Sequence, residues 1–269
     1  MFRIVHLSDL HFGRADQELL RPLLRSIESA TPNLIVISGD LTQRARRRQF
    51  VEARQFLALL TKPVLVIPGN HDIPWNPIER FFSPFEKYRR YISQELEPNF
   101  SNKEAAVFCI NTARNFERER GDIHPKQLES AKSFFADAEP GAIRVVVTHH
   151  PFDIPFGVKS RYRVKNAGRA MHALTEMGAD LFLAGHAHRC FSTCSTGFYR
   201  MTTRSSVIVQ AGTCVSTRVR GEPNSFNVVE LSGSEILIDV RNWDPSQGQF
   251  IRSVRTRFVM REHRWINAA

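Results

Sequence analysis

The chain has 269 residues, and its 37 lysines and arginines outnumber its 27 acidic residues, which gives a formal net charge of +10 at pH 7. Hydrophobic residues make up 42% of the sequence and charged residues 24%, so the composition excludes a disordered chain, a collagen or a coiled coil. No apolar run approaches the roughly 18–20 residues that cross a bilayer. Four cysteines in a chain of this length do not indicate a disulfide framework, and we expect reduced thiols.

The charge and the first residues bear on partners and location. A basic protein has affinity for anions, but nucleic acid, anionic lipid and small phosphorylated substrates all fit this description. Asp9 and His11 lie where a secretory signal would need its apolar stretch, so we expect a cytoplasmic protein.

Short apolar runs rich in β-branched residues alternate with amphipathic helical patterns up to about residue 190, which is typical of βαβ units. The expected strands are Arg3–Leu7, Leu34–Ser38, Val64–Ile67, Ala105–Ile110, Arg144–Thr148 and Asp180–Ala184. The expected helices are Gln17–Ser29, Gln49–Leu60, Pro125–Phe135 and Ala167–Met177. Residues 191–260 lack the helical pattern and predict mainly antiparallel strands, near Val207–Gln210, Ser225–Leu231, Glu235–Arg241 and Gln249–Val259. No linker interrupts this order, and we expect a single domain over residues 1–269.

The stretch 76–102 interrupts the alternation with two predicted helix starts. Asn76 and Ser83 are each followed by proline and, three residues on, by glutamate, which indicates two capped helices. An aromatic stripe runs along and beside them, consisting of Trp75, Phe81, Phe82, Phe85, Tyr88 and Tyr91. The stripe fits a helical excursion packed on the body, a lid, a dimer face or a membrane-contacting patch. Of the last three, we favour a lid or a dimer face.

Five polar clusters each follow the end of a predicted strand. They are Asp9-Leu10-His11, Gly39-Asp40, Gly69-Asn70-His71-Asp72, His149-His150-Pro151 and Gly185-His186-Ala187-His188. Functional groups gather at the carboxyl ends of strands in open α/β sheets, so we expect the clusters to converge on one edge. Each cluster alone is weak evidence, because a histidine pair on a turn is common, but the five together contain six of the ten histidines.

The side chains in these clusters are suited to divalent metals. Two aspartates, an asparagine and four histidines are too many ligands for one ion, but they suit two ions if one carboxylate bridges them. Mixed nitrogen and oxygen ligands accept several metals, with Mn²⁺ and Fe²⁺/Fe³⁺ favoured here and Zn²⁺ or Co²⁺ as alternatives.

The order D-x-H, G-D, G-N-H-D, H and G-H-x-H resembles the calcineurin-like metallophosphoesterase superfamily, and the motifs span residues 9–188. The segments LSDLHFG, VISGDL, VIPGNHD, THHP and AGHAH are most similar to class III cyclic-nucleotide phosphodiesterases and glycerophosphodiesterases. The resemblance implies a four-layer α/β/β/α sandwich of two mixed sheets flanked by helices, with residues 191–260 forming mainly antiparallel strands of the second sheet.

The resemblance also implies roles for individual residues. Asp9, His11, Asp40 and His188 would hold one metal, and Asp40, Asn70, His149 and His186 the other, with Asp40 shared. A hydroxide bridging the metals would attack phosphorus in line. His71 is the expected catalytic residue, either stabilising the phosphate or protonating the leaving oxygen, and Asp72 is expected to orient it. Of the two adjacent histidines we expect His149 to ligate and His150 to lie behind it.

Substrate-binding residues are less clearly marked. Asn70 and His71 would face the phosphate, and Arg218 and Arg220 would hold a phosphate or base by forked hydrogen bonds or else pair with acidic surface groups.

Four functions compete at this stage. We expect a metal-dependent phosphodiesterase of a small diester, with a 3′,5′- or 2′,3′-cyclic nucleotide as the leading candidate. The alternatives are a membrane-surface pyrophosphohydrolase of a lipid-linked substrate such as UDP-diacylglucosamine, a nuclease and, least favoured, a non-enzymatic scaffold. We therefore expect a small phosphodiester as partner, no stable nucleic-acid partner, possible contact with an anionic membrane and a possible homo-oligomer.

Overall fold

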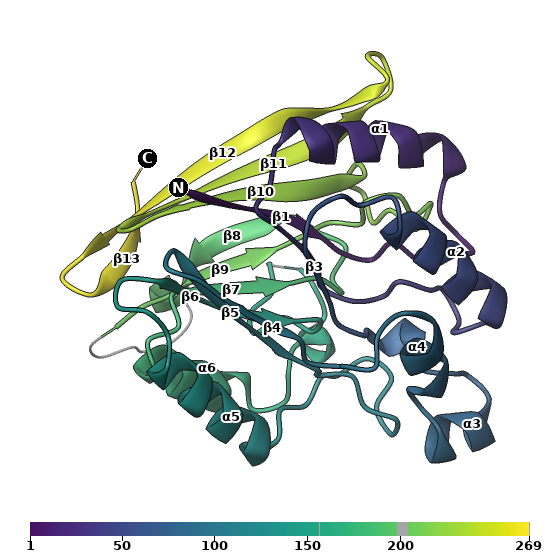
Figure 1. Cartoon of the computed structure of the whole chain (residues 1–269), viewed down its shortest axis with the longest axis horizontal. Coiled ribbons are helices and arrows are strands. Elements are labelled where there is room, and N and C mark those ends of the chain that lie inside the picture. The colour runs from purple at the N-terminus through teal and green to yellow at the C-terminus, as the bar shows by residue number, and fades with distance from the viewer. Residues whose placement is uncertain (156, 198–203, 269) are drawn as a thin grey trace.

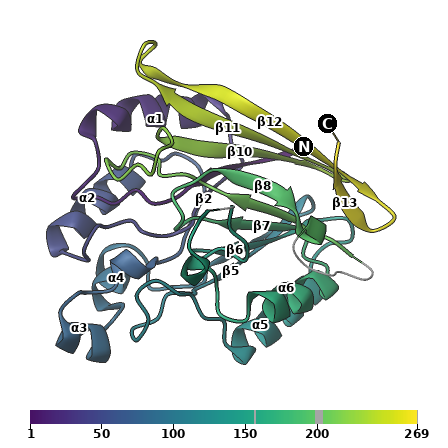
Figure 2. The same ribbon diagram turned by 180° about the vertical axis from the view of Figure 1, so that it is seen from behind.

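A computed structural model describes residues 1–155, 157–197 and 204–268 of the chain as two sheets that face each other, with helices on both outer sides (Figure 1). The side chains between the sheets form an apolar core that includes Val36, Val107 and Val145, all with no exposed surface. The four-layer α/β/β/α arrangement expected from the resemblance is confirmed. Figure 2 shows the same layers from behind.

The first sheet has seven strands in the order β13-β12-β11-β10-β1-β2-β3. Three strands from the amino-terminal part of the chain lie at one side of this sheet and pair in parallel: β1 (Phe2–Leu7), β2 (Leu34–Ile37) and β3 (Val64–Val66). The others are β10 (Ser225–Ser232), β11 (Glu235–Asp244), β12 (Gln249–Arg261) and β13 (Arg264–Asn267), which pair antiparallel.

The second sheet has six strands in the order β4-β5-β6-β7-β9-β8. They are β4 (Asn99–Ser101), β5 (Ala105–Ile110), β6 (Ile143–Thr148), β7 (Leu181–Ala184), β8 (Phe191–Cys194) and β9 (Val207–Gln210). β5, β6, β7 and β9 are parallel neighbours, and β4 and β8 pair antiparallel at the two edges.

The assignment of residues 191–260 to the second sheet is wrong for most of their length. Among the described residues of this range, only β8 and β9 join that sheet. β10 pairs antiparallel with β1, in a register that sets Phe2 opposite Leu231, and so extends the first sheet. Alternating apolar residues predict that a strand has a buried face, but they do not identify the sheet edge that receives it. The free edge of β1 takes β10, and successive hairpins then add β11, β12 and β13.

Helices cover the outer face of each sheet. α1 (Gln17–Ser29) and α2 (Arg47–Leu57) lie on the first sheet, and α5 (Pro125–Ala136) and α6 (Ala167–Glu176) on the second. In α1 the buried residues Leu19, Leu23 and Ile27 recur every four positions, so one stripe of the helix faces the sheet. The side chain of Asp16 accepts a hydrogen bond from the backbone N–H of Glu18 and caps this helix.

The excursion at 76–102 contains α3 (Pro77–Phe82) and α4 (Glu86–Tyr91). Asn76 caps α3 as expected, because its side chain accepts from the N–H groups of Ile78 and Glu79. The second start was placed too early: the Ser83 hydroxyl donates to the carbonyl of Glu79 at the end of α3, and α4 begins only at Glu86.

The aromatic stripe is divided between the interior and the surface. Tyr88 is fully buried, and its hydroxyl donates to the carbonyl of Val66 at 2.9 Å, which fixes α4 to the end of β3. Phe81 and Phe82 on α3 are 54% and 78% exposed. The packed-excursion interpretation therefore holds for Tyr88 and does not hold for the two exposed phenylalanines.

Candidate metal centre

All five polar clusters lie in the loops that follow strands, and hydrogen bonds between these loops join the two sheets. Asp9 and His11 follow β1, Asp40 follows β2, and Asn70 follows β3 in the first sheet. The remaining histidines come from the second sheet: His149 follows β6, and His186 and His188 follow β7. The expected convergence on one edge is thus realised across both sheets.

The backbone is unusual at these positions. Asp9, His11, Asp40, His186 and His188 all have positive φ, between 49° and 67°. Residues other than glycine rarely adopt this left-handed conformation, and such residues cluster where the surrounding structure holds side chains for function. Five of the seven predicted ligands therefore depend on backbone strain to point into the site.

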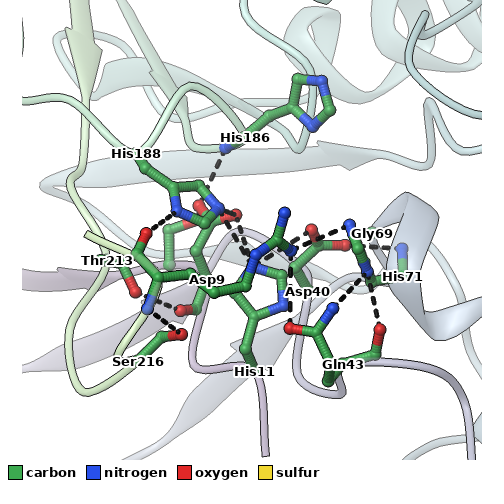
Figure 3. A network of polar contacts seen from close by, with 12 residues as sticks. Asp9, His11, Asp40, Gln43, Gly69, His71, His186, His188, Thr213 and Ser216 are labelled. Carbon is green, nitrogen blue, oxygen red and sulfur yellow. Dashed lines mark hydrogen bonds and ion pairs between the residues drawn. The ribbon is translucent and has the colours of Figure 1, made fainter. Parts of the chain in front are cut away.

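Asp9, His11 and His188 form the first group of possible ligands (Figure 3). Oδ2 of Asp9 accepts hydrogen bonds from the Ser8 hydroxyl and the backbone N–H of His186, at 2.7 and 2.8 Å. Oδ1 of Asp9 is left facing Nε2 of His188 at 3.2 Å and Nε2 of His11 at 3.6 Å. The two histidine Nε2 atoms are themselves only 3.0 Å apart.

The hydrogen bonds of these two rings determine where their protons lie. Nδ1 of His188 is 2.9 Å from the carbonyl of Arg218, and Nδ1 of His11 is 3.4 Å from that of Thr42. A carbonyl can only accept, so each neutral ring carries its proton on Nδ1 and a lone pair on Nε2. Burial lowers the pKa of His11 to about 4, although the carboxylates of Asp9 and Asp40 act in the opposite direction, so the His11 ring is neutral at pH 7.

The second group surrounds Nε2 of His149. This atom lies 3.0 Å from Oδ1 of Asn70, 3.2 Å from Nδ1 of His186 and 3.4 Å from Oδ1 of Asp40. Nδ1 of His149 donates to the carbonyl of Ser38 at 2.8 Å, so Nε2 is again directed into the group. Asp40 also faces the first group, since its Oδ2 is 3.7 Å from Nε2 of His11. Asp40 is therefore positioned between the two groups.

The electrostatics of both groups favour a positive charge. Burial alone would raise the pKa of Asp40, but His149, His71 and His11 hold the pKa well below its usual range, so the carboxyl is ionised. Burial lowers the pKa of His149, yet Asp40 and Asp9 outweigh burial and raise it to about 9. A position that stabilises a proton so strongly also stabilises a metal cation.

The donor set fits divalent cations by an independent criterion. Oδ1 of Asp9 and Nε2 of His186 are buried and have no hydrogen-bond partner among the described residues, although buried polar atoms are normally paired. A Cβ on Gly69 would collide with the carboxylate of Asp40, and a Cβ on Gly185 would lie 2.6 Å from Oδ2 of Asp9. The close approach of these loops to the carboxylates therefore requires glycine.

The expectation that Asp72 orients the ring of His71 is wrong. Both oxygens of this fully buried carboxylate are engaged by the loops after β2 and β3. They accept from the N–H groups of Leu41, Thr42 and Gly69 and from the Thr42 hydroxyl, at 2.8–3.1 Å. Asp72 thus ties together the loops that carry Asp40 and Asn70, and it contributes to the site through the backbone.

A different residue orients His71. Nδ1 of His71 donates to the carbonyl of Gln43 at 2.7 Å. This leaves Nε2 of the same ring as an acceptor, which lies 3.3 Å from Nη1 of Arg218. Figure 3 shows His71 and Gln43 beside Asp40. The backbone N–H of His71 donates to Oδ1 of Asp40, which links His71 to the ligand groups. The Gln43 side chain also takes part, since its Nε2 lies 3.3 Å from Nδ1 of His71 and its Oε1 accepts from Nη1 of Arg218 at 3.5 Å. No sequence motif identifies this residue.

Arg218 and Arg220 have different surroundings. Arg218 is half-buried, and its Nη1 lies 3.3 Å from Nε2 of His71. The Arg220 guanidinium lies 4.9 Å from the ring centre of Tyr162, and that ring packs edge-on against His186. Sequence reasoning missed Tyr162, which contacts both Arg220 and the possible ligand His186. The His150 ring packs against His149 and His186, with which it forms a further group of possible ligands, and its Nδ1 lies 2.8 Å from the Thr112 hydroxyl.

Two adjoining hollows, of about 720 and 590 Å³, open over the site and share His71, Trp75 and Arg218. The larger is lined by both charges, through Arg118, Arg120, Arg161, Glu117 and Glu119 among others. The smaller is lined by Arg14, Arg44 and Arg46, and no acidic side chain of the described residues lines it. Trp75, which sequence analysis placed in the aromatic stripe, stands between Arg44 and Arg118, whose guanidinium groups lie 5.2 and 5.1 Å from its ring centre.

The two-sheet fold and the two groups of possible metal ligands can be compared with those of known families. The model of the calcineurin-like phosphoesterase family matches residues 2–190, and the chain belongs to this family. Among solved structures, a purple acid phosphatase from yellow lupin superposes with a TM-score of 0.70 at 13% identity, over 94% of this chain and 53% of the lupin chain. A dimetal phosphatase from Danio rerio superposes with a TM-score of 0.64 at 13% identity, over 90% and 96% of the two chains. At 13% identity, these superpositions show a common fold alone.

Curated relatives carry three different substrate names. The UDP-2,3-diacylglucosamine pyrophosphatase LpxG of Chlamydia trachomatis is 24% identical over 225 residues, which cover 69% of this chain and 63% of the relative. The glycerophosphodiester phosphodiesterase GpdQ of Enterobacter lignolyticus is 32% identical over 80 residues, covering 26% and 29%. A probable cyclic nucleotide phosphodiesterase of a Pseudoalteromonas species is 24% identical over 200 residues, covering 69% and 71%. The matched segment spans less than two thirds of LpxG.

Replacing Asp72 tests whether this residue stabilises the loops after β2 and β3 or orients the ring of His71. Asp72→Ala would leave three buried N–H groups without an acceptor, and we expect a loss of at least about 3 kcal/mol of unfolding free energy, since each such group costs about 1–3 kcal/mol. Asp72→Asn keeps one acceptor oxygen and should lose about half as much. Urea unfolding measures both losses. A wild-type midpoint combined with a large fall in turnover would instead return Asp72 to the role of orienting His71.

Proposed function

We propose that this protein is a phosphoester hydrolase that uses two divalent cations. Asp9, His11 and His188 would hold one cation, Asn70, His149 and His186 the other, and Asp40 both. The support is the two converging ligand groups, in which Oδ2 of Asp40 faces one group and Oδ1 the other. Such a cation pair supplies a nucleophile at neutral pH and neutralises charge on the phosphoryl oxygens. Manganese or iron suits this mixture of nitrogen and oxygen ligands, as zinc or cobalt also does.

His71 and Arg218 would bind the phosphoryl group from the solvent side. The Gln43 carbonyl holds the His71 proton on Nδ1, so Nε2 faces outward together with the Arg218 guanidinium. Arg218 supplies fixed positive charge where negative charge develops on the phosphoryl oxygens. With a second proton on Nε2, His71 acts there either as a further donor to the phosphoryl oxygens or as the acid that delivers this proton to the leaving oxygen.

The substrate, in this proposal, carries a sizeable group on each side of the scissile phosphate. The observation that carries this is the pair of hollows that meet at His71 and Arg218. The smaller, arginine-lined hollow suits a further anionic group, and the larger hollow, lined by both charges, suits the other half of the substrate. A phosphoanhydride or a phosphodiester with two large substituents has this shape, whereas a phosphate monoester would leave one hollow empty.

Two relatives support different members of this class. LpxG is named a pyrophosphatase of UDP-2,3-diacylglucosamine, which has a large group on both sides of its phosphates. The relative named a probable cyclic nucleotide phosphodiesterase keeps the small cyclic diester as the second candidate. The two hollows favour the larger substrate over the cyclic nucleotide that sequence analysis placed first.

Asp40→Ala tests the shared ligand. Removing a carboxylate that serves both groups should abolish turnover and remove at least about one equivalent of bound metal, because a bridging carboxylate stabilises both cations of a pair. Elemental analysis of the purified variant beside the wild type measures the metal. Full metal content with activity within about tenfold of wild type would contradict the two-cation proposal.

His71→Ala separates the two roles of this histidine. The variant should retain its metal and lose roughly 10²–10⁴ in kcat, the range for one acid or one charge-stabilising group. If His71 delivers a proton, the loss should be much smaller with p-nitrophenolate, which leaves without one, than with an alkoxide. Equal losses on both leaving groups would reject the acid role and retain charge stabilisation.

A substrate panel tests the two-sided substrate. We expect kcat/KM for bis-p-nitrophenyl phosphate and a UDP-linked pyrophosphate to exceed that for p-nitrophenyl phosphate and both cyclic nucleotides by about tenfold or more, the value of about 1.4 kcal/mol of added transition-state binding. Arg46→Gln, in the smaller hollow, should raise KM for the UDP-linked substrate and leave the nitrophenyl diester unchanged. Preference for the monoester or for a cyclic nucleotide would overturn this substrate class.

A further inference from the structure

The outer side of α3 carries an apolar cluster that the proposed chemistry does not use. Ile78, Phe81, Phe82 and Phe116 are 71%, 54%, 78% and 76% exposed, and we call these four residues the aromatic surface. The Phe81 ring packs edge-on against Phe82 and Phe116, with ring centres 4.9 and 5.5 Å apart. Single exposed apolar residues are ordinary, but a contiguous group of this kind marks an interaction site.

A buried arginine holds the aromatic surface in place. Arg80 on α3 is only 8% exposed. It donates four hydrogen bonds, at 2.6–3.3 Å, to the carbonyls of Pro74, Arg114, Asn115 and Glu117. These bonds fix the loop that carries Phe116 against α3, so both segments present their phenylalanines outward together. The apolar side chains are thus displayed on a braced support instead of folding into the core.

The surroundings of the aromatic surface are positively charged. Residues 75–91 and 114–120 contain seven lysines and arginines against four acidic residues. Three of the acidic side chains are already held in ion pairs of 2.5–2.6 Å: Glu79 with Lys87, Glu117 with Lys165, and Glu119 with Arg161. Apolar side chains surrounded by arginines complement a bilayer that contains anionic lipid, because the rings enter the acyl boundary while the guanidinium groups contact headgroups.

A lid and a dimer face both fit the aromatic surface less well than a bilayer does. A lid would need these rings over the site, but of the sequence-predicted stripe only Trp75 lines a hollow, and α3 lies at the outer corner of the molecule in both views (Figures 1 and 2). A dimer face needs about 800 Å² on each partner. The four side chains expose only on the order of 500 Å², judged from about 150–250 Å² for a whole aromatic side chain.

We propose that the aromatic surface docks the protein on membranes containing anionic lipid. The larger hollow is lined by Arg80, Glu117 and Arg118, which come from the same two segments as the aromatic surface. Docking would therefore bring the mouth of this hollow to the lipid headgroups. None of the helices in the described residues combines the length and apolar character of a membrane-spanning helix. This inference does not depend on the proposed reaction, because vesicle binding is measured without turnover.

The test compares the wild type with Phe82→Ser/Phe116→Ser in vesicle flotation. We expect the wild type to float with phosphatidylcholine vesicles that contain about 30 mol% phosphatidylglycerol, to bind pure phosphatidylcholine at least about fivefold less, and to be released by about 0.5 M NaCl. The double variant should bind the anionic vesicles at least about tenfold less. Leu59→Ser/Val254→Ser, which replaces two exposed apolar residues elsewhere (60% and 53% exposed), should bind like the wild type.

Measurements of turnover and thermal stability show whether the double variant is folded and active. Turnover of a soluble nitrophenyl diester and the thermal midpoint should be unchanged in the double variant, because both side chains lie outside the core and both hollows. Should the double variant fail to fold, Phe82→Trp takes its place, and its added fluorescence should shift to the blue with anionic vesicles only.

Three results would overturn the proposal. The first is a wild type that does not float with anionic vesicles, and the second is a double variant that floats as well as the wild type. The third is a wild-type dimer that the double variant converts to a monomer in sedimentation velocity, which would assign the aromatic surface to a second copy of this chain. Unchanged turnover with lost flotation supports membrane docking whatever the substrate is, so the two proposals fail independently.

Discussion

Mutual repulsion among buried electron-pair donors is the constraint on which the arrangement of this molecule depends. Nε2 of His11 and Nε2 of His188 lie 3.0 Å apart with their protons committed to backbone carbonyls on the other side of each ring. Two buried carboxylates, Asp9 and Asp40, add negative charge beside them. Such a cluster is costly without a cation, because burial removes the water that would otherwise solvate it. The loops must therefore hold these groups together against their repulsion until positive charge arrives.

Backbone conformation and hydrogen bonds from both sheets hold these side chains together. Positive φ values at Asp9, Asp40 and His186 turn side chains inward that ordinary backbone would direct elsewhere. Hydrogen bonds cross between the sheets at this point, among them those from His149 to the carbonyl of Ser38 and from the backbone of His186 to Asp9. The buried carboxylate of Asp72 adds a brace within the first sheet. Strain of this kind persists only where the surrounding contacts over-determine it, as they do here.

The sequence predicted the parts of this arrangement that follow from local rules. Gln17–Ser29 was located to the residue because its apolar period and its Asp16 cap agree, and each ligand motif was found at a strand end because β-branched runs stop there. The predictions that failed concern contacts between segments that are far apart in the sequence. The free edge of β1 that receives β10, and the backbone donors that occupy Asp72, lie far away in sequence and leave no periodic signal. Gln43 was not predicted because its contacts with His71 and Arg218 join segments far apart in the sequence and follow no motif.

The seven candidate ligands are spread over residues 9–188 and come from five strands in two sheets. A metal pair bound there would act as a cross-link that exists only while both sheets are folded and docked. Opening either sheet at its metal-bearing end would release the ions, so ligand-linked free energy is added to the whole structure, about 2.7 kcal/mol when free metal is a hundred times its dissociation constant. Metal supply in the cell would then control the lifetime of the chain against proteolysis, independently of its control of turnover.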